Sequence, residues 1–175
     1  MIKKQYSIIL MVFFVVLFAS NCIGEPLTPQ LCKAKVQAAV KLIAAIGDEA
    51  IAKIKDPKGE FSFGDGKGYI WIQDREGLMV MHPNVPSLDG KPLFGIKDIN
   101  NVYLFAAFDE VVEENGSGWV GYMWPKPKVK VSSPKVSFVM LAKGGSKDYI
   151  VGAGMYDVTA DDIKKDFPGD AIYKD

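Results

Sequence analysis

The spacing of apolar residues changes once along the chain, and this change limits the possible folds more than any other feature. From Leu31 to Ile46 apolar side chains recur every three or four residues, which predicts an amphipathic helix. Thr28 can cap this helix, Pro29 suits its first position and Gly47 ends it. Further on, apolar and aromatic residues alternate in short stretches bounded by glycine and proline, which is typical of strands and tight turns. A long leading helix followed by a sheet is therefore expected.

The alternating part divides into five strands, expected over residues 68–74, 78–82, 119–124, 134–142 and 149–156. Helical segments are expected over residues 49–54, 98–114 and 160–165. The inner face of the helix over 98–114 is predicted to hold Val102, Phe105, Ala106, Phe108 and Val112. We therefore predict an α+β fold in which the long N-terminal helix packs on a five-stranded antiparallel sheet, with a helical crossover between the second and third strands.

The N-terminus has the pattern of a secretory signal peptide. Lys3 and Lys4 precede twelve apolar residues over 8–19, and small or turn-forming residues follow up to Gly24. A membrane-spanning helix needs about 20 apolar residues, so an uncleaved anchor is the weaker alternative. Cys22 raises the alternative of a lipoprotein, but Asn21 is a poor residue before a lipidated cysteine. We predict a signal peptide over 1–24 and one ligand-binding domain over 25–175, located in the periplasm or secreted.

Composition excludes several classes of function. Twenty-one basic residues balance 21 acidic ones, which argues against nucleic-acid binding through net charge. One histidine and two cysteines exclude zinc sites with several histidines or four cysteines, and no phosphate loop or nucleophile elbow occurs, so no cofactor or metal is expected. A catalytic cysteine needs a base, and the sequence around Cys32 offers only lysines for that role, so we expect a buried small apolar residue there.

Strand alternation predicts which side chains share a face. Ile70 and Ile72 should face the leading helix at Val36, Val40 and Ile43. The opposite face of that strand then carries Tyr69 and Trp71. Tyr122 and Trp124 share one face of the strand over 119–124, and Lys135 and Ser137 share one face of the strand over 134–142. Aromatic walls with a few polar groups are typical of small-ligand pockets.

Lys135 is the unusual residue of this set, because it begins an otherwise apolar strand. If it is buried it needs an anionic partner, and a ligand carboxylate would serve. The alternative is that Lys135 extends to solvent at a strand edge and the aromatic residues form core. His82, at a strand end before Pro83, either donates a hydrogen bond to an acid or closes its own loop. The candidate ligand-binding residues are Tyr69, Trp71, His82, Tyr122, Trp124 and Lys135.

Five segments carry a resemblance to a known family. They are GYIWIQDREGLMVMHPNVPSLDGKPL (68–93), the DINN and LF pieces within 98–105, GSGWVGYMWPKP (116–127), SPKVSFV (133–139) and VGAGMYD (151–157). In this order after a long helix, they resemble the single Cache domain, a small PAS-like extracellular sensor module, over residues 33–156. The resemblance implies a pocket between the sheet and the loops over its outer face, and sensing of a short organic acid such as acetate, propionate, lactate or pyruvate.

The same resemblance implies partners. Such domains usually sit on a chemoreceptor or kinase, but about 19 residues without an apolar segment follow Tyr156, so we expect a free-standing version that acts with a separate membrane receptor or kinase. A homodimer through the N-terminal helix is a further expectation. The alternatives are a structural envelope protein without ligand, and an enzyme on small acids that uses Tyr122, Lys135 and His82 as an acid–base set. We expect a binding domain rather than an enzyme.

Overall fold

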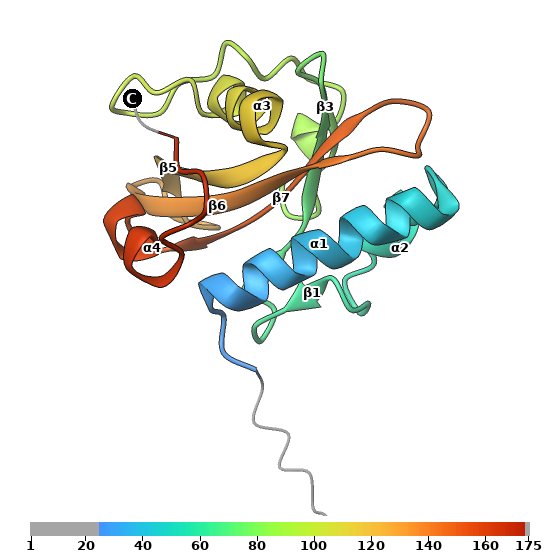
Figure 1. Cartoon of the computed structure of the whole chain (residues 1–175). Coiled ribbons are helices and arrows are strands. Elements are labelled where there is room, and N and C mark those ends of the chain that lie inside the picture. Colours follow the sequence, from blue (N-terminus) through green and yellow to red (C-terminus); the bar gives the residue numbers. More distant parts are fainter. Residues whose placement is uncertain (1–24, 174–175) are drawn as a thin grey trace, which may run out of the picture.

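The computed structural model describes residues 25–173, so the predicted signal peptide over 1–24 and Cys22 lie outside the described residues. Within them, helices cover both faces of a five-stranded antiparallel sheet, which confirms the predicted α+β fold (Figure 1). The strand order is β4-β3-β7-β6-β5. The five strands are β3 (Trp71–Asp74), β4 (Met79–Met81), β5 (Ser117–Pro125), β6 (Ser132–Ala142) and β7 (Tyr149–Tyr156).

The leading helix α1 (Pro29–Ile46) has the predicted bounds. The Thr28 hydroxyl accepts a hydrogen bond from the Leu31 amide at 3.1 Å, and Gly47 ends the helix with a φ of 62°. Its inner stripe buries Leu31, Cys32, Val36, Ala39 and Ile43. The short helix α2 (Glu49–Lys55) follows and packs beside α1.

The two faces of the sheet bury two separate clusters. Ile70 and Ile72 pack with Val36 and Ile43 of α1, and Val40 lies against the same cluster, which confirms the predicted orientation. The other face packs against α3 (Leu104–Asn115), so a helix as well as loops covers the face over which the resemblance implied loops. In Figure 1, α1 and α3 lie on opposite sides of the sheet.

Helix α3 begins at Leu104 rather than at the predicted residue 98. The Asp98 carboxylate accepts the backbone N–H groups of Asn100 and Val102 at 2.8 and 2.9 Å, and Asn101 has a φ of 67°. This turn replaces the first helical turn, because an aspartate side chain can satisfy the same amides as a helix. Because the helix begins later than predicted, a different set of its residues faces the sheet. The prediction of Val102 and Ala106 as inner residues was wrong, and Leu104, Ala107 and Val111 are buried instead.

The predicted strand over 68–74 is divided at Ile70. Its first part, β2 (Gly68–Tyr69), pairs with β1 (Ser62–Phe63), a short strand that the sequence did not predict, and β3 begins at Trp71. A 3-10 turn (Pro86–Leu88) follows β4, and α4 (Ala160–Asp166) begins with a capping box between Thr159 and Asp162. None of the helices between residues 25 and 173 is long and apolar enough to cross a membrane.

Candidate functional site

The Lys135 side chain is buried between three tyrosines on the α3 side of the sheet. It lies on β6, where its neighbours in register are Tyr122 of β5 and Tyr156 of β7. The ammonium donates a hydrogen bond to the Tyr69 hydroxyl at 3.0 Å. It also lies 4.7 Å from the centre of the Tyr156 ring and 5.9 Å from that of Tyr122, distances at which cation–π attraction acts.

The charge of Lys135 has no protein counter-ion in the described part of the chain. None of the ion pairs between residues 25 and 173 includes Lys135. Only 3% of the residue is exposed, so it does not extend to solvent, and that alternative is excluded. Burying an ammonium without an anion costs free energy. The protein therefore holds a positive charge in a place where an anion would stabilise it.

His82 lies next to this charge as a neutral imidazole. Its Nδ1 accepts the backbone N–H groups of Asn84 and Val85 at 3.3 and 3.0 Å, which assigns the ring proton to Nε2. Burial, and then the nearby charge of Lys135, lowers the pKa of His82 to about 4. The loop-closing role is therefore present, and the Nε2–H remains as a hydrogen-bond donor.

A small cavity brings the predicted site residues together. Its walls include Trp71, His82, Tyr122, Trp124 and Lys135. Tyr69 does not line the cavity, but its hydroxyl accepts the hydrogen bond from Lys135. The free volume is about 10 Å³, about enough for one water molecule. Five of the six candidate residues therefore line one cavity, and the sixth, Tyr69, is connected to it through Lys135.

Several neighbours of this cavity were missed by sequence reasoning. Helix α3 contributes Leu104, Phe105 and Phe108 to the wall. Ser137, which alternation had placed on the face of Lys135, shares a 2.9 Å hydrogen bond with the Tyr122 hydroxyl. Tyr156 was missed because it becomes a neighbour of Lys135 only once β6 and β7 pair.

Glycines of β7 make room for the site. A Cβ placed on Gly154 would lie 3.0 Å from Cε of Lys135 and 2.8 Å from the Val136 carbonyl oxygen. The second separation is shorter than real Cβ contacts, the first is tight, and the same Cβ would overlap the Ser137 hydroxyl oxygen. The lysine side chain can therefore cross β7 because residue 154 has no side chain.

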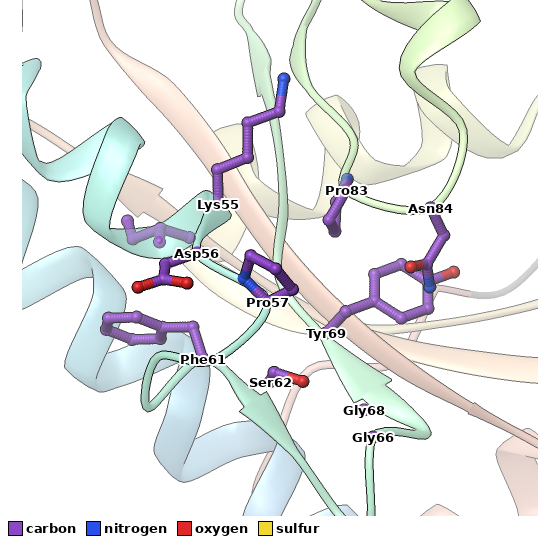
Figure 2. A pocket seen from close by; sticks show the side chains of 11 residues that line it. Lys55, Asp56, Pro57, Phe61, Ser62, Gly66, Gly68, Tyr69, Pro83 and Asn84 are labelled. Atoms are coloured by element: carbon purple, nitrogen blue, oxygen red, sulfur yellow. The ribbon is translucent and has the colours of Figure 1, made fainter.

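A second, larger cavity of about 300 Å³ has Tyr69 in its wall. We call it the outer cavity, and the small cavity at Lys135 the inner cavity. Figure 2 shows Tyr69 and Asn84 on one side of this outer cavity and Asp56 and Phe61 on the other. Tyr69 thus lies between the outer cavity and Lys135. Its pKa is raised to about 12 by burial, so its hydroxyl is neutral at physiological pH.

The chemistry of the inner cavity is that of hydrogen-bond donation. It offers the ammonium of Lys135, the Nε2–H of His82 and tyrosine hydroxyls, and its side chains include no carboxylate. Cys32 lies in the α1 cluster and burial raises its pKa to about 12, so it is not a thiolate nucleophile. Among residues 25–173 no group of three or more histidine, cysteine, aspartate or glutamate side chains gathers as metal ligands.

Comparison with known proteins gives matches over most of the chain. Residues 33–172 match the family model of the Cache domain. The methyl-accepting chemotaxis protein McpP of Pseudomonas putida is 36% identical over 106 residues, which are 59% of this chain and 18% of McpP. The matched segment therefore spans less than a fifth of the length of that relative.

Three solved structures share the fold. A periplasmic sensor domain of a chemotaxis protein is 36% identical with a TM-score of 0.61, covering 74% of this chain and 94% of the other. A Cache chemosensory domain, solved to explain carboxylic acid recognition, is 29% identical with a TM-score of 0.60 and coverages of 74% and 92%. A methyl-accepting chemotaxis protein from Vibrio parahaemolyticus is 25% identical with a TM-score of 0.60 and coverages of 73% and 86%. The resemblance seen in the sequence is thus confirmed, and the chain belongs to the Cache-domain family.

Proposed function

We propose that this chain is a sensor-type domain that binds a short monocarboxylate at Lys135, outside the cytoplasmic membrane. One observation carries the proposal: the buried ammonium of Lys135 faces a cavity and has no ion-pair partner among residues 25–173. A carboxylate would neutralise this charge and form short, charge-assisted hydrogen bonds with it.

The composition of the site favours one carboxylate over two. Lys135 is the one cationic side chain of the cavity wall, since His82 is neutral at physiological pH. The second carboxylate of a diacid would lie among aromatic rings without a counter-ion, which is costly. The free volume of about 10 Å³ equals about one water molecule, so the walls must move apart for any acid, and acids of a few carbon atoms, such as acetate, propionate, lactate or pyruvate, require the smallest movement.

The relatives support the same class of function. One similar domain was solved to explain carboxylic acid recognition, and another is described as the periplasmic sensor domain of a chemotaxis protein. We extend both descriptions to this chain as part of the proposal: a small acid as ligand, and a membrane receptor or kinase as the partner that responds to it. The outer surface of α1, with Ala34, Gln37 and Lys41 exposed, is the proposed homodimer contact.

Titration calorimetry of the domain over residues 25–175 with a panel of short acids, diacids, amines and neutral sugars tests the proposal. We expect binding of monocarboxylates and its loss in Lys135→Met, because the acid would then be buried without its cation, at a cost of about 3–5 kcal/mol. Tyr122→Phe should cost less, about 0.5–1.5 kcal/mol for one neutral hydrogen bond. Lys130→Met, at the exposed tip of the same hairpin, is the matched control. Binding of amines or sugars instead, or acid binding that persists in Lys135→Met, contradicts the proposal.

A further inference from the structure

The Trp71 indole ring lies against Gly152, a position of β7 that has no side chain. Trp71 of β3 and Gly152 of β7 are direct partners in register. A Cβ placed on Gly152 would overlap three atoms of the Trp71 indole ring. The contact is with ring atoms, so residue 152 sets how deeply the indole lies against the sheet.

Helix α3 holds the other side of the same ring. The centre of the Phe108 ring lies 4.9 Å from that of Trp71, and Phe105 meets it edge-on at 6.2 Å. Trp71 is 3% exposed, so no solvent gap exists into which the ring could swing. The indole is therefore packed between β7 on one side and α3 on the other, and contacts on both sides fix its position.

The Trp71 ring is also part of the wall of the inner cavity, together with Lys135. An acid whose carboxylate meets Lys135 must place its hydrocarbon chain among the remaining wall residues, which are aromatic or aliphatic apart from His82. Because the free volume is about 10 Å³, each additional methylene has to displace a wall.

Resting on the proposed function, we propose that Trp71, seated on Gly152, is the residue that sets the length of the acid accepted at Lys135. Shortening the side chain at 71 opens room for methylene groups. Each methylene that becomes buried contributes about 0.8 kcal/mol, which is about fourfold in affinity. Adding a Cβ at 152 pushes the ring off β7 toward α3 and narrows the same space.

The test is calorimetry with acetate, propionate, butyrate and valerate on wild type, Trp71→Leu and Gly152→Ala. In Trp71→Leu we expect the affinity for butyrate relative to acetate to rise by about sixteenfold, the product of two methylenes at about fourfold each. Gly152→Ala should weaken propionate more than acetate, and combining it with Trp71→Leu should relieve the overlap and restore binding. Trp71→Phe is the milder variant if Trp71→Leu does not fold. Gly121→Ala on β5 is the control, because its Cβ would lie 3.5 Å from Ala160, an ordinary contact.

The outcomes separate this inference from the proposed function. If wild type binds no carboxylate, the proposed function fails and this inference fails with it. If wild type binds acids through Lys135 but Trp71→Leu or Trp71→Phe weakens every acid by the same factor, Trp71 is only a structural wall residue and this inference alone is overturned. Unchanged chain-length preference in Gly152→Ala overturns the role assigned to Gly152.

Discussion

Replacing Lys135 and Tyr69 together by Met and Phe should make the ligand-free domain more stable while it abolishes acid binding. The ammonium is 3% exposed and has no carboxylate partner in the described chain. Exchanging buried ionic groups for apolar ones of similar size commonly stabilises by about 1–4 kcal/mol. Lys135→Met alone leaves the Tyr69 hydroxyl without its 3.0 Å partner, at a cost of about 1–3 kcal/mol. The double variant Lys135→Met/Tyr69→Phe removes both partners and avoids this cost.

Urea unfolding of ligand-free protein at pH 7 measures the effect, with wild type and both single variants in the same series. We expect the double variant to gain about 1–4 kcal/mol in unfolding free energy, which at this chain length raises Tm by about 2–4 °C per kcal/mol. Saturating acid should raise the Tm of wild type and leave that of the double variant unchanged. A double variant that is less stable than wild type by more than about 1 kcal/mol would refute the reasoning, because the lysine would then contribute to the fold itself.

Three further predictions concern pH, the core and export. The pKa of His82 is lowered from 6.5 to about 4 in the fold, so its contribution to stability is complete above about pH 6.5 and is lost as pH falls toward 4. Urea unfolding should therefore show a loss of about 3 kcal/mol in unfolding free energy between pH 7 and pH 4 that is absent in His82→Gln. Equal losses in both proteins would contradict this. Ile72→Ala should cost about 2–5 kcal/mol because the residue is fully buried against α1, and a loss below about 0.5 kcal/mol in the same assay would mean that the site is not packed. Edman sequencing of exported protein should start near Glu25; a start at Met1 would exclude cleavage, and lipid labelling that is lost in Cys22→Ala would establish a lipoprotein.

Much of the architecture was predictable because local signals agreed with the tertiary packing. The cap at Thr28, the proline at position 29 and the glycine at 47 set α1 before any tertiary contact is considered. Alternation assigned Ile70 and Ile72 to the α1 face and Trp71 to the other, since one face of each strand is buried against a different layer. The same alternation placed the candidates Tyr69, Trp71, Tyr122, Trp124 and Lys135, whereas His82 was chosen for its position at a strand end.

The errors have physical causes that lie in tertiary contacts. Asp98 can cap a helix or close a turn, and here its second carboxylate oxygen accepts the Met123 amide of β5 at 2.8 Å, which holds the turn against the sheet. The two-residue strand β1 is too short to leave a periodic signal. Tyr156 and Gly152 join the site only through the register of β7 with its neighbours, which no local pattern encodes.

A crystal structure of the domain grown with propionate tests the central claim most directly. The account predicts that the carboxylate occupies the inner cavity, with one oxygen about 2.7–2.9 Å from Nζ of Lys135 and the chain toward Trp71, after the walls have moved apart. The Nε2–H of His82 should donate to the same carboxylate. Propionate bound only in the outer cavity of Figure 2, with the inner cavity unchanged around Lys135, would contradict it.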